Sequence, residues 1–127
     1  MALLAYVEMC ASDAFDQYRQ SEGLNLPQSR TVFALSGAGA LSMEEIVRRT
    51  VLPPASVEDA LPGLVDRHFV APSDGAYTLT DDGRALCSRL TGHVERFESE
   101  HLNGISKQDI AAARRVLEHL YERLRPG

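Results

Sequence analysis

Lysine, tryptophan and cysteine are scarce in this sequence. Lys107 is the only lysine among the 13 basic residues of the 127-residue chain, and there is no tryptophan. The two cysteines, Cys10 and Cys87, are too few for a disulfide framework, which favours a reducing compartment. No apolar run approaches the roughly 18 residues of a membrane span, and the N-terminus lacks the positive region of a signal peptide. We therefore expect a cytoplasmic protein that does not contact a membrane.

Composition and charge are those of an ordinary globular domain. The chain is 44% hydrophobic and 24% charged, and a chain of this length buries roughly two-thirds of its unfolded surface. No repeat or linker divides it, so we expect one domain over residues 1–127. The net charge of −5 excludes a basic nucleic-acid packager, although a dimer with a local basic stripe remains compatible with it.

The first part of the chain predicts helices. Apolar side chains recur at helical spacing over residues 2–21, and Gly23 follows as a C-terminal glycine. Pro27 opens a second helix, which the small residues 36–39 end. Together they predict two helices before a turn.

Capping patterns mark the next two helices. Ser42 with Glu45 forms a capping box for a short third helix, and Ser56 with Asp59 is a second such pattern before the fourth. Pro62 lies inside this fourth helix, where a proline costs about 3 kcal/mol unless the helix kinks.

A β-hairpin and two long helices complete the chain. Asp74 and Gly75 stand between two short β-prone runs, 69–71 and 76–79, which predicts a hairpin. Thr80 caps the fifth helix. Ser106 caps the last, whose apolar stripe is typical of a helix packed along another helix: Ile110, Ala113, Leu117, Leu120 and Leu124.

This order of elements predicts a mainly α fold with a small β-hairpin wing. Helix, helix and hairpin in succession are the layout of a winged helix-turn-helix, here over residues 27–84. Residues 1–22 and 85–125 then form helices outside this lobe.

Four segments carry a resemblance to the MarR family of bacterial winged-helix regulators. Residues 26–35 resemble the family's second helix, 41–47 its third, and 57–70 its recognition helix. The most specific match is Leu-Thr-Asp-Asp-Gly-Arg-Ala-Leu at 79–86, similar to the family signature after the wing. The resemblance implies a homodimer built from the terminal helices, DNA binding by the fourth helix and the wing, and a small-ligand or redox switch.

Candidate DNA contacts follow from the positions of polar residues in the matched segments. Four of them have an alternative interpretation: Arg48, Arg49 and Arg67 pair with neighbouring carboxylates, and Ser56 is only a helix cap. The candidates are Gln28, Arg30, Arg48, Arg49, Ser56, Arg67 and Arg84.

The charge of the winged lobe departs from the family pattern. Between residues 42 and 84 stand four arginines and eight carboxylates, and affinity for DNA depends largely on cations that neutralise phosphates. The short wing has no basic residue, and Glu58 and Asp59 lie near the start of the recognition helix. A second interpretation is therefore a winged-helix homologue that has lost ordinary DNA binding and acts as a protein-interaction or ligand-binding module.

A small aromatic ligand is the second expected partner. The family's crevice lies between the dimer helices and the winged lobe, and Phe15, Tyr18, Phe33 and Leu86 are the candidates to line it. Arg30 or His93 would anchor a carboxylate. The alternative is that all four are ordinary core residues.

Enzymatic, metal and redox functions have little support. No nucleophile, base and orienting residue form a catalytic set, and the four histidines have no metal-ligand spacing, so we expect no cofactor. Cys10 invites comparison with the peroxide-sensing branch of the MarR family. Glu8 and Asp13 nearby disfavour its thiolate, so a buried structural cysteine is the favoured interpretation, and Cys87 is interpreted in the same way.

Overall fold

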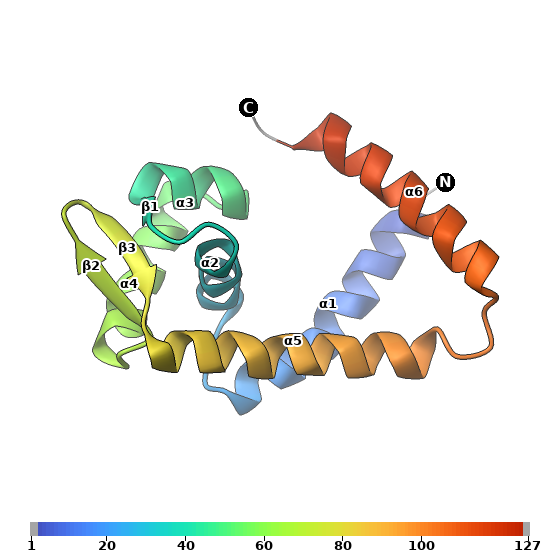
Figure 1. The fold of residues 1–127 in the computed structure, drawn as a ribbon, viewed down its shortest axis with the longest axis horizontal. Helices are drawn as coiled ribbons and strands as arrows, with labels where there is room; N and C mark the ends of the chain where they lie inside the picture. The colour runs from blue at the N-terminus through green and yellow to red at the C-terminus, as the bar shows by residue number, and fades with distance from the viewer. Residues whose placement is uncertain (1–2, 126–127) are drawn as a thin grey trace.

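The computed structural model describes residues 3–125, which form six helices and a small three-stranded sheet (Figure 1). Figure 1 shows the winged lobe at one end of the long helix α5 and α6 leading away from its other end. In chain order the elements are α1 (Leu3–Ser21), α2 (Leu26–Ser36), β1 (Leu41–Ser42), α3 (Met43–Thr50), α4 (Pro54–Asp66), β2 (Val70–Ser73), β3 (Ala76–Leu79), α5 (Asp81–His101) and α6 (Lys107–Leu124).

Local side-chain caps start four of the helices. The predicted caps at Ser42, Thr80 and Ser106 are confirmed, because each side chain accepts a hydrogen bond from a backbone N–H in the first turn of its helix. Helix α2 has a further capping box, in which Asn25 accepts from the backbone of Gln28 and the Gln28 side chain accepts from the backbone N–H of Asn25.

The cap predicted at Ser56 is wrong. Helix α4 begins two residues earlier, at Pro54, and its N-cap residue Pro53 makes no side-chain hydrogen bond. A proline in the first turn loses no helical hydrogen bond, because its missing N–H would have no partner there. The N–H of Ser56 already donates to the carbonyl of Pro53, so this residue lies inside the helix.

Strand β1 was not predicted, and it completes the sheet in the order β1-β3-β2. It has two residues, of which Leu41 pairs with Tyr77 of β3. The predicted hairpin between β2 and β3 is confirmed, and Asp74 and Gly75 both have positive φ, as a tight two-residue hairpin turn requires.

The hydrophobic core lies in the winged lobe, the first half of α5 and the turn before α2. No described residue of α1 or α6 is buried. Pro62 is exposed within an unbroken α4, whose buried face packs on α2 and α3. The core consists of Leu24, Val32, Leu35, Leu41, Ile46, Val57, Leu61, Leu64, Val70, Leu79, Leu86 and Leu90.

Val51 ends α3 in the left-handed region, with φ 54° and ψ 42°. This conformation costs a β-branched residue about 1–2 kcal/mol, and the side chain, 70% exposed, gains little packing in return. We expect Val51→Gly to raise the free energy of unfolding by about 0.5–1 kcal/mol, because glycine adopts this conformation freely at a smaller entropic cost. Chemical denaturation measures it. Val51→Ala removes the same packing but keeps the strained Cβ, so an equal gain in both variants would contradict the explanation.

Candidate nucleic-acid interface and ligand cavity

Two arginines of the candidate DNA surface are exposed at the end of α3. Arg48 and Arg49 lie in its last turn, and no ion pair within residues 3–125 includes either of them. Glu45, one turn earlier, is held by hydrogen bonds from the backbone and side chain of Ser42, which lower its pKa. These two guanidinium groups are therefore available to an external anion.

The candidates at the start of α2 have partners within the chain. Nη1 of Arg30 donates to the carbonyl oxygen of Thr50 at 3.2 Å, which ties α2 to the end of α3. The amide of Gln28 belongs to the capping box, and its nitrogen lies close to Gly63 of α4.

Arg84 is also paired. It forms an ion pair with Asp81, one turn earlier on α5, and its Nη1 donates to the carbonyl of Leu79 at 3.2 Å.

Arg67 at the C-terminus of α4 faces the turn between α1 and α2. Its two terminal nitrogens donate to the carbonyl oxygens of Gly23 and Glu22, at 3.0 and 2.8 Å. The guanidinium also lies over the ring of Phe69, 4.8 Å from the ring centre.

Acidic side chains occupy much of the exposed surface of α4 and the wing. Glu58 and Asp59 are exposed on the first half of α4, and Asp74 is exposed at the tip of the wing. Ser56 is half-buried on the same helix. The lobe thus combines a basic end of α3 with an acidic first half of α4.

A small aromatic cavity of about 70 Å³ lies between α1, α2 and α5. Phe15, Tyr18 and Phe33, three of the four predicted residues, line it together with His93. The fourth, Leu86, is fully buried in the lobe core, and Leu90 one turn later takes its place on the wall.

One stacked and one tilted pair of aromatic rings hold α1 against α5 around this cavity. The rings of Tyr18 and His93 are parallel within 7°, with centres 4.6 Å apart, and Phe15 lies 4.7 Å from Phe97. Nη2 of Arg96 lies 2.6 Å from Nδ1 of His93. Because arginine only donates, Nδ1 acts as the acceptor in this arrangement.

Arg19 is a cavity residue that sequence reasoning missed. It follows Phe15 by one helical turn, which is the only sequence signal for it. Its side chain is 11% exposed, and Nη2 donates to the carbonyl of Ser12. The buried Nε lies 3.5 Å from Oδ1 of Asp16 and forms an ion pair with it, but no hydrogen bond. Arg19 and Arg30 both line an adjoining cavity of about 260 Å³. A cation thus stands beside the aromatic walls.

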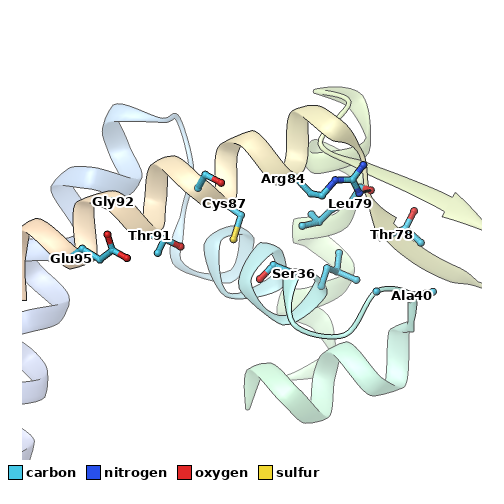
Figure 2. A pocket seen from close by; sticks show the side chains of 12 residues that line it. Ser36, Ala40, Thr78, Leu79, Arg84, Cys87, Thr91, Gly92 and Glu95 are labelled. Atoms are coloured by element: carbon cyan, nitrogen blue, oxygen red, sulfur yellow. Dashed lines mark hydrogen bonds between the residues drawn. The ribbon is translucent and has the colours of Figure 1, made fainter.

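A larger groove of about 660 Å³ runs along another face of α5 (Figure 2). Leu35 and Leu79 are among the residues that line it. The Cys87 sulfur points into it from α5. Arg84 and Glu95 lie toward its two ends. Helix α5 therefore has one face toward the aromatic cavity and another toward this groove.

The favoured interpretation of Cys10 as a buried cysteine is wrong. Its side chain is exposed on α1, and Cys87 is half-buried. Within residues 3–125 of one chain, the first half of α1 lies outside the core, so its side chains, Cys10 included, are exposed.

Solved structures resemble this chain over nearly its full length. A MarR family transcriptional regulator from Silicibacter pomeroyi is 21% identical, with 98% of this chain and 89% of that chain covered and a TM-score of 0.85. The MarR family protein Rv2887 of Mycobacterium tuberculosis, in complex with DNA, is 28% identical, with 93% and 94% covered and a TM-score of 0.82. The chain has the fold of the MarR family.

Two further MarR-fold structures match at lower TM-scores. Rv2887 in complex with salicylic acid has a TM-score of 0.75 over the same coverage. BpsR of Bordetella bronchiseptica, whose DNA binding is regulated by 6-hydroxynicotinic acid, is 25% identical, with 93% and 90% covered and a TM-score of 0.75. No protein family model and no curated protein sequence matches the chain.

Residues 3–125 contain neither a membrane-spanning helix nor a cluster of metal ligands. No helix there is long and apolar enough to span a bilayer. No cluster of three or more histidine, cysteine or carboxylate side chains in the same part of this MarR-fold chain is placed to hold a metal ion.

Proposed function

We propose that this protein is a cytoplasmic, homodimeric, non-enzymatic transcriptional regulator that binds duplex DNA and responds to a small aromatic ligand. The observation that carries the proposal is the similarity to the structure of Rv2887 in complex with DNA. This similarity extends over nearly the whole chain and includes the winged lobe. In this proposal α4 is the recognition helix, and the β2–β3 hairpin is the wing.

Two exposed apolar faces support a dimer. One covers the first half of α1 and the other lies on α6, where a groove of about 530 Å³ runs between α6 and the end of α5. We assign the groove to α1 of the second copy. The apolar face of α1 in one subunit would then cover the apolar face of α6 in the other, and both are exposed to water in a single chain. The exposed residues are Leu3, Leu4, Tyr6, Val7, Met9, Leu102, Ile105, Val116, Leu117, Tyr121 and Leu124.

The aromatic cavity supports a ligand response. Salicylic acid and 6-hydroxynicotinic acid, the molecules named with the neighbouring structures, each join an aromatic ring to a carboxylic acid. Phe15, Tyr18 and Phe33 offer apolar walls for such a ring, and Arg19 and His93 offer donors for the acid. At about 70 Å³ the cavity is far smaller than the roughly 300 Å³ at which ligand pockets begin. Binding therefore requires α1 to move away from α2 and α5.

DNA binding with a modest salt dependence is the test of the regulator. If Arg48 and Arg49 of each subunit neutralise one phosphate each, log affinity is expected to fall with log salt at a slope of about −4 for the dimer. Arg48→Ala or Arg49→Ala should weaken binding to all sequences alike. Selection of genomic fragments at low salt supplies the DNA, and a salt titration of the selected fragments measures the slope. Arg115→Ala removes the same charge on α6 and is expected to have no effect.

The acidic start of α4 gives a second prediction with the opposite sign. Changing Glu58 and Asp59 together to Gln and Asn removes four negative charges per dimer from the proposed interface. Non-specific DNA affinity is expected to rise by about tenfold at low salt, because like charges across an interface are repulsive. Asp13→Asn with Glu100→Gln removes the same charge from exposed positions outside the winged lobe and the α6 groove, and is the control. Equal tightening in both variants would assign the effect to net charge and not to the interface.

The acidic lobe favours one alternative function. If the protein shows no salt-dependent binding to any genomic fragment at about 50 mM salt, it is not a regulator of this type. It then acts as a protein-interaction or ligand-binding module on the same fold.

A further inference from the structure

We propose that Arg67 is a positioning residue that couples the ligand-contacting helix α1 to the recognition helix α4. The inference rests on the proposed function, because it concerns how movement at the aromatic cavity reaches the DNA-binding surface. Arg67 is thereby assigned to coupling within the subunit, and not to phosphate binding.

The two contacts of Arg67 lie at the end of α1. The turn that follows Ser21, the last residue of α1, supplies both acceptors, because the carbonyls of Glu22 and Gly23 accept from the Arg67 guanidinium. A planar guanidinium bridges two acceptors with defined geometry, which a lysine ammonium does not do. Among residues 3–125 these are the only side-chain hydrogen bonds between this turn and α4.

Arg67 is itself fixed to the recognition helix. It is the C-cap residue of α4, with its own N–H donating to the carbonyl of Gly63 at 3.1 Å. Stacking over Phe69 holds the guanidinium on the side of the turn. A displacement of its two acceptors therefore acts on the last turn of α4.

The same turn is held from α5 by a second arginine. Arg89 forms two close contacts with the Glu22 carboxylate, Nε to Oε1 at 3.0 Å and Nη2 to Oε2 at 3.1 Å. This hydrogen bonding raises the pKa of Arg89. The Glu22 side chain is only 18% exposed, so the pair is partly shielded from water. Glu22 thus contacts α4 through its backbone and α5 through its side chain.

The position of this turn makes it a transmission point. Phe15, Tyr18 and Arg19 of α1 form one side of the aromatic cavity, and the turn held by Arg67 begins only three residues after Arg19. A ligand that enlarges the cavity moves α1 as a rigid helix and carries the two carbonyls with it. Because the Arg67 guanidinium holds both carbonyls, this movement acts on the last turn of α4 and changes the orientation of the recognition helix.

The first experiment needs neither DNA nor ligand. Phe15→Ala loosens the cavity side of α1, and amide hydrogen exchange is measured in the last turn of α4 in the full-length protein. Exchange there is expected to rise by about tenfold in the parent, but by less than about twofold in an Arg67→Ala background, because coupled sites respond non-additively. Equal responses in both backgrounds, or no response in either, overturn the proposal.

Two further variants separate coupling from simple stabilisation. Arg67→Lys keeps the charge but bridges the two carbonyls poorly, so it is expected to give an intermediate response and serves if Arg67→Ala does not fold. Glu22→Gln weakens the Arg89 pair yet leaves both backbone acceptors, so it should destabilise the turn while retaining transmission to α4. Loss of transmission in Glu22→Gln equal to that in Arg67→Ala would show that Arg67 has no special role.

The second experiment measures regulation directly, with salicylate as the probe. In Arg67→Ala, salicylate is expected to bind within about twofold of the parent affinity while its effect on DNA affinity falls at least about fivefold. An unchanged effect of salicylate on DNA affinity overturns the proposal. If the parent binds no DNA, the proposed function fails, and the exchange experiment still decides the coupling.

Discussion

Replacing Leu117 and Tyr121 by glutamate is expected to make the protein monomeric in sedimentation, with the winged lobe still folded. These side chains are 54% and 65% exposed on α6, and in the proposed dimer they lie under α1 of the second copy. Burying an unpaired carboxylate costs several kcal/mol. Two such carboxylates in each subunit are therefore expected to cost more free energy than dimer formation releases. Because no residue of α6 belongs to the lobe core, the lobe is expected to keep its helical circular dichroism.

The control for this prediction adds charge to another part of the same helix. Arg115→Glu with His119→Glu places two carboxylates on α6 outside the groove that contains Leu117 and Tyr121, and it should leave the dimer intact. Sedimentation across a concentration series distinguishes the three proteins. A parent that is monomeric at every concentration would contradict the dimer, and so would a Leu117→Glu, Tyr121→Glu variant that still dimerises.

Features of the fold set by neighbouring residues were predictable from the sequence. The caps at Ser42, Thr80 and Ser106 and the hairpin turn at Asp74 and Gly75 each depend on residues within about four positions. Strand β1 was not predictable, because two residues have no periodicity and form a strand only through pairing with β3.

The candidate site depends on distant contacts and was predicted less completely. Helical spacing placed Phe15 and Tyr18 on one face of α1, and the resemblance directed that face toward α2 and α5, where the aromatic cavity lies. The acceptors of Arg67 are 44 and 45 residues away in the sequence, so no local pattern indicates that its side chain faces α1. The exposure of Cys10 likewise depends on which surfaces the chain leaves uncovered.

The second large effect is expected at Gly83, where α5 begins against the end of the lobe. A Cβ at this position would lie 2.0 Å from the carbonyl oxygen of Phe69 and 3.1 Å from Cδ2 of Leu79. The Phe69 carbonyl cannot easily move away, because it accepts the backbone N–H of Thr80 at 3.0 Å. The hydroxyl of Thr80 in turn caps α5 by accepting from the N–H of Gly83. The backbone of the wing and the start of α5 are thus in direct contact.

We expect Gly83→Ala to lower the free energy of unfolding by at least about 2 kcal/mol, since overpacking against backbone exceeds the gain in helix propensity of about 1 kcal/mol. Gly92→Ala is the matched control on the same helix, because a Cβ there meets no atom within 4 Å. It is expected to stabilise by about 0.5–1 kcal/mol. Thermal unfolding at equal protein concentration measures both, so that dimer formation does not bias the comparison. If both variants are stabilised, the contact between Gly83 and Phe69 does not fix the start of α5.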